Sequence, residues 1–167
     1  MKLAIIMSGM LRNFEHTFLS TKKFILEDKF FEKKDIFFYG YSDSFELDES
    51  KKKFEKLYKP KKFKIEEWNE NIKHSIEMKT ASNKWPKFQT ASSVTNIMSS
   101  WRCRYLANEF KIAFEKVNNF KYDLVYQLRT DFFCFNYIDH KLAIKASQEK
   151  NSIYIPKDWD HKDADPI

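Results

Sequence analysis

The sequence contains little cysteine and little glycine. Two of its 167 residues are cysteines and two are glycines. A pair of cysteines cannot build a disulfide framework, and no Cys/His cluster has the spacing of a zinc site. Cys103 and Cys134 are therefore interpreted as small buried hydrophobic residues. The glycines, Gly9 and Gly40, are too few for a GxGxxG fingerprint, and no GK[ST] is present, which excludes both the dinucleotide-binding loop and the P-loop.

Long hydrophobic runs are also missing. No apolar run reaches the roughly 18 residues that a membrane-spanning helix needs, and the first one, residues 3–7, is too short for a signal peptide. These absences predict a cytoplasmic protein. The excess of positive charge is mild, with 30 Lys and Arg against 24 Asp and Glu, a net charge of +6. It permits anionic ligands, but without an RNP-type or helix-turn-helix pattern it predicts no nucleic-acid partner.

Aromatic residues, in contrast, are abundant: 17 Phe, 8 Tyr and 4 Trp. That much apolar ring area offsets the entropy cost of ordering the chain and argues against disorder. A chain of this length buries about 70% of its unfolded surface, which is enough for a core without disulfides or metals. No repeat and no Pro/Gly/Ser-rich linker divides the sequence, so residues 1–167 are predicted to form a single domain.

Short apolar segments alternate along the chain with amphipathic segments. Strands are predicted at residues 3–7, 35–39, 63–65, 124–128 and 153–155, and helices at 14–25, 45–58, 96–117 and 138–146. The first helix is expected to begin at the cap residue Asn13, while Ser8–Met10 and Gly40 are expected to end the first two strands. Residues 74–89 are interpreted as a loop. Strands that alternate with helices predict an α/β fold, a mostly parallel sheet flanked by helices.

The predicted helix at 96–117 has the strongest periodicity. Its large apolar residues are expected to form one stripe that packs on the sheet: Ile97, Trp101, Leu106, Phe110, Ala113, Phe114 and Val117. Arg102 and Arg104 lie near its start, two positions apart, so they cannot share a face. At most one of them is expected to reach a ligand site, and two surface arginines are the alternative.

Ligands of parallel sheets bind beyond the carboxyl ends of the strands. Three polar segments stand at such ends in the predicted sheet: residues 8–12, 40–43 and 129–131. In the first, Ser8 and Gly9 allow a close backbone approach, and the helix amides together with Arg12 favour an anion. The alternative there is a turn glycine beside a solvated arginine. In the second, Asp43 suits a ribose or a base, or else it caps a turn.

Arg129-Thr130-Asp131 follows the predicted strand at 124–128. A carboxylate in this place suits Mg²⁺ or Mn²⁺, hard ions that proteins bind through one or two carboxylates plus substrate phosphates. The alternative is a structural ion pair of Arg129 with Asp131 or with Asp123. The residues alone leave both interpretations open.

Two segments resemble a known family. Residues 2–14 contain an apolar strand, then Ser8-Gly9-Met10-Leu11-Arg12 and an aromatic residue. This segment resembles the opening of bacterial capsular and lipopolysaccharide GT-A-like glycosyltransferases. Residues 122–131 are similar to the family's YD-apolar-apolar-x-x-x-R-x-D strand. The resemblance implies a Rossmann-like GT-A fold that binds a nucleotide-diphospho-sugar donor and transfers the sugar to a hydroxyl of a glycan or lipid-linked acceptor.

The same resemblance implies roles for the residues at the strand ends. With the arginines of the long helix, the predicted donor-binding set is Ser8, Gly9, Arg12, Asp43, Arg102, Arg104, Arg129 and Asp131. Asp131 stands where the family places its metal-binding acidic motif, which implies a divalent cation, Mn²⁺ or Mg²⁺. The motif here is R-T-D, with one carboxylate in place of D-x-D, and Arg129 is an alternative partner for the phosphate charge.

The chain ends soon after the predicted strand at 153–155, where GT-A-like enzymes continue into elements that build the acceptor site. The sequence is therefore expected to be a truncated, N-terminal, donor-binding portion of such an enzyme. Two alternatives remain: a non-catalytic nucleotide-binding or interaction domain, and a basic module that binds nucleic acid or an acidic membrane. The Lys-rich surface also predicts peripheral contact with the inner membrane, where lipid-linked acceptors would lie.

Overall fold

The computed structural model describes residues 1–43, 47–69 and 91–149. Its elements are, in order, β1 (Lys2–Met10), α1 (Phe14–Thr21), the π-helical turn η1 (Lys22–Leu26), β2 (Lys33–Ser42), α2 (Leu47–Tyr58), β3 (Lys62–Glu67), α4 (Ala91–Asn118), β4 (Leu124–Arg129) and α5 (His140–Gln148). They belong to two units, Met1–Tyr137 and Ile138–Ile167, and α5 lies in the second. None of the helices described is both long and apolar enough to cross a membrane.

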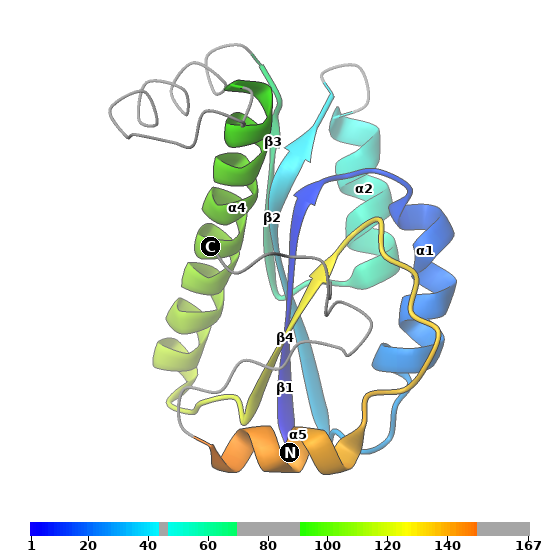
Figure 1. Ribbon diagram of the computed structural model, residues 1–167, viewed down its shortest axis with the longest axis vertical. Helices are drawn as coiled ribbons and strands as arrows, with labels where there is room; N and C mark the ends of the chain where they lie inside the picture. Colours follow the sequence, from blue (N-terminus) through cyan, green and yellow to red (C-terminus); the bar gives the residue numbers. More distant parts are fainter. Residues whose placement is uncertain (44–46, 70–90, 150–167) are drawn as a thin grey trace, which may run out of the picture. The chain divides into compact units, whose positions relative to one another are not determined.

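The first unit is built on a four-stranded parallel sheet in the order β3-β2-β1-β4. Helix α4 covers one face of the sheet, and α1 and α2 cover the other (Figure 1). The central strands are buried on both faces, which is why their sequences are continuous apolar runs instead of alternating ones. Ile5, Phe37 and Phe38, for example, are fully buried. The predicted α/β fold with a parallel sheet flanked by helices is confirmed.

The two central strands run further than the sequence predicts. β1 continues through Gly9 to Met10, and β2 continues through Gly40 to Ser42, so the expected strand ends at these glycines are wrong. The reason is that Gly9 and Gly40 face each other in the parallel ladder. A Cβ atom on Gly40 would collide with the Gly9 carbonyl oxygen. The glycines therefore permit a close approach of two backbones inside the sheet.

The first helix begins where the sequence predicts, but not in the predicted way. Asn13 occupies the N-cap position with a left-handed φ of 52°, and its side chain makes no capping hydrogen bond. The α-helix ends at Thr21 and is followed directly by η1. The predicted helix at 14–25 is therefore an α-helix followed by a π-helical turn. Residues Phe14, Thr17, Thr21 and Ile25 are buried along it.

The face of α4 that packs on the sheet is the predicted one only in part, since Leu106, Phe110 and Phe114 of the predicted stripe do pack against the core. Cys103 and Ala107 are fully buried against Ile6, Tyr39 and Tyr41, with Leu106 and Phe110 packed beside them. Four residues of the predicted stripe are exposed instead: Ile97, Trp101, Ala113 and Val117. Trp101 lies two positions before Cys103, which is about 200° around a helix, so both residues cannot face the sheet. The face with the small side chains packs on the sheet because Cys103 and Ala107 let the helix approach the sheet closely.

The other predicted elements agree with the structure where it describes them. Helix α2, the edge strand β3, strand β4 and helix α5 all form within a few residues of their expected bounds. In α5, the carboxylate of Asp139 accepts hydrogen bonds from the amides of Lys141 and Leu142 and so caps the helix. Cys134 is buried, as Cys103 is. The predicted loop at 74–89 and the predicted strand at 153–155 lie outside the described residues.

Candidate functional site

The strand order places a switch point between β1 and β4. The chain adds β2 and then β3 on one side of β1, and it returns to the other side of β1 with β4. In open α/β sheets, ligands bind at the carboxyl ends of the strands where the order reverses in this way. In this protein the segment after β4 turns to the same face as α1, where the Cys134 amide donates a hydrogen bond to the Ser20 hydroxyl. Ser8 pairs with Arg129 in the register of β1 and β4. The two candidate segments, 8–12 and 129–131, therefore meet at this point.

Two buried threonines tie these segments together. The Thr130 hydroxyl donates a hydrogen bond of 2.7 Å to the Met10 carbonyl, and the Thr17 hydroxyl donates one of 2.6 Å to the Thr130 carbonyl. Each threonine is 1% exposed. Thr130 thus connects the end of β4 to the end of β1 and to α1. The sequence motif R-T-D contains Thr130, but no pattern in the sequence pointed to Thr17.

The end of β1 has an unusual backbone conformation. Gly9 has a φ of 111°, which residues with a Cβ atom rarely adopt. Two residues later the Leu11 amide donates a hydrogen bond of 2.8 Å to the Tyr41 carbonyl, which attaches the loop to β2. Ser8 is 4% exposed and so lies within the sheet. Arg12, in contrast, is exposed.

Arg129 and Asp131 form a bidentate ion pair at the switch point. Arg129 donates through Nε and Nη2 to the two carboxylate oxygens of Asp131, at 2.8 and 2.7 Å. These hydrogen bonds lower the pKa of Asp131, and the charge of Arg12 adds to the lowering. Asp123, the other partner considered for Arg129, instead accepts a hydrogen bond of 2.6 Å from the Lys2 amide. Three charged side chains, Arg12, Arg129 and Asp131, therefore act on one another here, with a net positive charge.

The carboxylate that the sequence assigns to a divalent cation, Asp131, is paired with Arg129 in this structure. Both of its carboxylate oxygens accept hydrogen bonds from Arg129. Within 1–43, 47–69 and 91–149, no group of three or more His, Cys, Asp or Glu side chains is placed to hold a metal ion. A hard cation with a single carboxylate ligand would also have to displace a guanidinium from it. The two arginines at these strand ends, Arg12 and Arg129, are suited to meet phosphate charge.

Three other predicted donor-binding residues lie apart from the switch point. Arg102 reaches the carboxyl ends of β2 and β3, where its Nη1 atom donates to the Tyr41 hydroxyl at 2.5 Å and to Glu66 at 3.0 Å. The Arg104 guanidinium lies over the Trp101 ring, 5.4 Å from its centroid. Asp43 is exposed just beyond β2. The structure thus brings Ser8, Gly9, Arg12, Arg129 and Asp131 together and leaves Arg102, Arg104 and Asp43 outside this group.

The Arg102 cluster stabilises the carboxyl end of the sheet. Burial alone would raise the pKa of Glu66, but hydrogen bonds from Lys64, Tyr39 and Arg102 lower it to about 2. Burial and the hydrogen bond with Glu66 raise the pKa of Tyr39 to about 12. The cluster therefore stays in one charge state over the ordinary pH range. Its bonding is already satisfied within the protein, which indicates a structural role.

We expect Glu66→Gln to remove a pH-dependent part of the stability. The pKa of Glu66 is depressed from 4.5 to about 2 in the folded protein, so its contribution is complete above pH 4.5 and is lost as the pH falls toward 2. The contribution at neutral pH should be about 1–2 kcal/mol after screening by solvent. Urea unfolding of both proteins between pH 7 and pH 2.5 should give a stability difference that shrinks with acid. Glu67→Gln, on the exposed side of β3, is the matched control, and an unchanging Glu66 difference would contradict the prediction.

Comparisons of this chain with protein-family models, with curated proteins and with solved structures found no match. The function therefore has to be inferred from the residues and the geometry of the chain itself.

Proposed function

We propose that this protein binds a nucleotide-diphospho-sugar at the switch point between β1 and β4 and transfers the sugar to a hydroxyl of a surface glycan. The observation that carries the proposal is the meeting of the S-G-x-x-R and R-T-D segments at the carboxyl ends of these two strands. Strand order independently selects the same place for a ligand. The resemblance of both segments to GT-A-like glycosyltransferases is the reason for proposing sugar transfer as the reaction.

The charges at the carboxyl ends of β1 and β4 support a diphosphate ligand. Arg12 and Arg129 are both exposed at the strand ends, and a guanidinium donates two parallel hydrogen bonds to a phosphate as readily as to a carboxylate. We expect the diphosphate to compete with Asp131 for Arg129. Gly9 has open space where a Cβ atom would stand, so the backbone of the loop is accessible to a ligand on that side.

In the proposed reaction, the acceptor oxygen forms a bond to the anomeric carbon of the sugar as the bond from that carbon to the diphosphate breaks. The acceptor proton passes to a base, and the nucleoside diphosphate leaves with an added negative charge. Arg129 and Arg12 would stabilise that charge because it is greater in the transition state than in the bound donor. A divalent cation is a further proposal from the resemblance, and its effect on binding is measurable.

A nucleotide thermal-shift panel tests the proposal directly. UDP, GDP, CDP and CMP are each added with and without Mn²⁺. A ligand at about 100 times its Kd adds about 2.7 kcal/mol, which should raise Tm by about 5–10 °C for a chain of this size. A rise with one nucleoside diphosphate supports the donor site and identifies its base. No rise with any of them in a well-folded sample would overturn the proposal.

The second candidate is a nucleotide-binding or interaction domain without turnover. It is favoured by the Arg129–Asp131 pair, which occupies the carboxylate closest to the proposed donor site. The two candidates differ in one measurable property. Release of nucleotide from a matching sugar donor, dependent on added glycan acceptor, would rule out the second, and binding without release would favour it. A cytoplasmic location and contact with the inner membrane stay predictions.

A further inference from the structure

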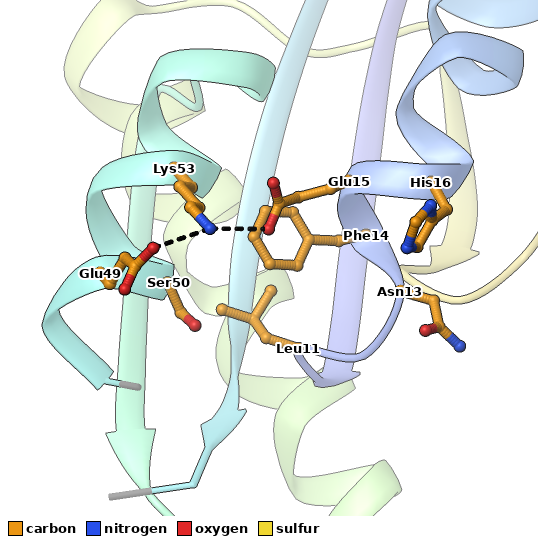
Figure 2. Close-up of a pocket in the computed structure, with 8 residues that line it drawn as sticks. All are labelled: Leu11, Asn13, Phe14, Glu15, His16, Glu49, Ser50 and Lys53. Atoms are coloured by element: carbon orange, nitrogen blue, oxygen red, sulfur yellow. Dashed lines mark ion pairs between the residues drawn. The ribbon is translucent and has the colours of Figure 1, made fainter. Parts of the chain in front are cut away.

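A small pocket lies between the starts of α1 and α2, with a volume of about 210 Å³. Figure 2 shows Leu11 and Phe14 on one side of it and Glu49, Ser50 and Lys53 on the other. All of its lining residues come from 11–16 and from 49–53. None belongs to β4 or to the segment after it, so the pocket is distinct from the switch point between β1 and β4.

Among the described residues, the pocket contains one buried hydroxyl that no other group bonds, that of Ser50. Ser50 is 7% exposed, and it has no hydrogen-bond partner among the residues that the structure describes. A buried hydroxyl that lacks a partner destabilises the protein, and a polar ligand that bonds to it removes that cost. The start of α1 adds further donors, since its first amides donate no hydrogen bond to the side chain of Asn13. The Ser50 hydroxyl and the start of α1 thus line the same pocket.

The charges of the pocket select a neutral ligand. The Lys53 ammonium lies between two carboxylates, 3.3 Å from Glu15 and 2.8 Å from Glu49 (Figure 2). Two carboxylates and one ammonium leave a negative charge that repels phosphates and acids. A cationic ligand would have to compete with Lys53, which already bridges both carboxylates. The same groups readily exchange hydrogen bonds with neutral hydroxyls, because the carboxylates accept and the ammonium donates.

The size of the pocket limits the ligand to a small one. Pockets for drug-sized ligands usually have volumes of about 300–1,000 Å³, and this one is smaller. A nucleotide therefore does not fit, whereas a single sugar ring suits both the volume and the mixture of donors and acceptors. Leu11 and Phe14 add an apolar side against which the C–H face of a ring can pack.

We infer that this pocket binds one neutral sugar ring, and that in the proposed transferase the ring belongs to the acceptor glycan. The second part rests on the proposed function, whereas the first part does not. The segment 11–16 links the two sites, since Arg12 at the switch point lies between Leu11 and Asn13. A sugar in the pocket would therefore contact the same loop that carries Arg12.

An NMR titration of the full chain tests the inference. A panel of neutral hexoses, 6-deoxyhexoses and N-acetylhexosamines is added to about 50 mM, because a single ring is expected to bind weakly. At least one sugar should produce saturable shifts of the amides of Ser50, Lys53 and residues 11–16. Ser50→Val replaces the hydroxyl and narrows the pocket, and it should weaken binding at least about tenfold. Ser50→Ala keeps the space and should weaken binding by a smaller factor.

Matched variants on one helix control for general effects. Glu49→Gln removes a pocket carboxylate and should weaken sugar binding several-fold. Glu55→Gln makes the same substitution at an exposed position of α2 outside the pocket and should change nothing. The inference is overturned if no sugar gives saturable shifts, or if the shifts persist unchanged in Ser50→Val and Glu49→Gln.

The outcomes for the pocket and for the proposed function are separable. A nucleotide thermal shift without sugar binding would overturn the inference that the pocket binds a sugar, and would still support the donor site. Sugar binding that depends on Ser50, without any nucleotide shift, would support the pocket and overturn its role as an acceptor site.

Discussion

Gly40→Ala should destabilise the protein by about 3 kcal/mol or more, and lower Tm by about 10 °C. The added Cβ would collide with the Gly9 carbonyl oxygen and lie 2.5 Å from the Cζ atom of Phe38. Neither neighbour can move easily, because Gly9 is backbone of the central strand β1 and Phe38 is fully buried. Chemical denaturation monitored by circular dichroism measures the loss.

The matched control for this variant is Ser42→Ala. It places the same small side chain two residues further along β2, where a Cβ atom is already accommodated. Its cost should stay below about 1 kcal/mol. Gly9→Ala should fall between the two, since open space surrounds its Cβ position and only the φ of 111° opposes the change. A Gly40→Ala protein as stable as the Ser42→Ala protein would contradict the pairing of Gly9 with Gly40.

Arg129→Ala should weaken the binding of a nucleoside diphosphate by about 10- to 100-fold. The reason is the loss of a guanidinium that can make two charge-assisted hydrogen bonds to phosphate oxygens. Isothermal titration calorimetry in EDTA, with the nucleotide that gives the largest thermal shift, measures the change. Lys121→Ala removes the same charge at the opposite end of β4 and should have no effect.

Asp131→Asn distinguishes the two ways of holding the diphosphate. If the arginines hold it, the substitution frees Arg129 from its bidentate partner and removes a negative charge, so the affinity in EDTA should be equal or higher. If Asp131 instead holds Mn²⁺ or Mg²⁺, the substitution should abolish a metal-dependent part of the binding. We expect the first result. Equal affinity of Arg129→Ala and the unaltered protein would remove Arg129 from the site altogether.

The candidate site was partly visible in the sequence. Gly9, Arg12 and the R-T-D motif all stand at strand ends, and their positions follow from where apolar runs stop. The sequence left open whether Arg129 pairs with Asp131 or with Asp123, because both carboxylates are near it along the chain. The structure places Asp131 on Arg129, whereas Asp123 accepts from the Lys2 amide at the other end of the sheet.

The prediction for α4 was right for Leu106, Phe110 and Phe114 and wrong for Trp101, and the reason is physical. Hydrophobic size points to Trp101 as a core residue, yet Trp101 is 61% exposed and Cys103 is fully buried. The distance between a helix and a sheet depends on the side chains of both partners. Tyr39 and Tyr41 on β2 are large, so the facing helix needs small residues such as Cys103 and Ala107. The fit between the sizes of these side chains depends on α4 and β2 together, so the sequence of α4 alone does not show it.

The helices and strands of this protein and the parallel class of its sheet follow from the order of residues along the chain. Continuous apolar runs such as 3–7 require burial on both faces, and alternation with helical segments makes the strands parallel. These are local patterns, so they can be recognised before the chain is folded. Strand order, the Gly9–Gly40 contact and the pocket around Ser50 were decided only by the tertiary structure. Each joins segments distant in the chain, and which of them meet depends on the packing of the whole core.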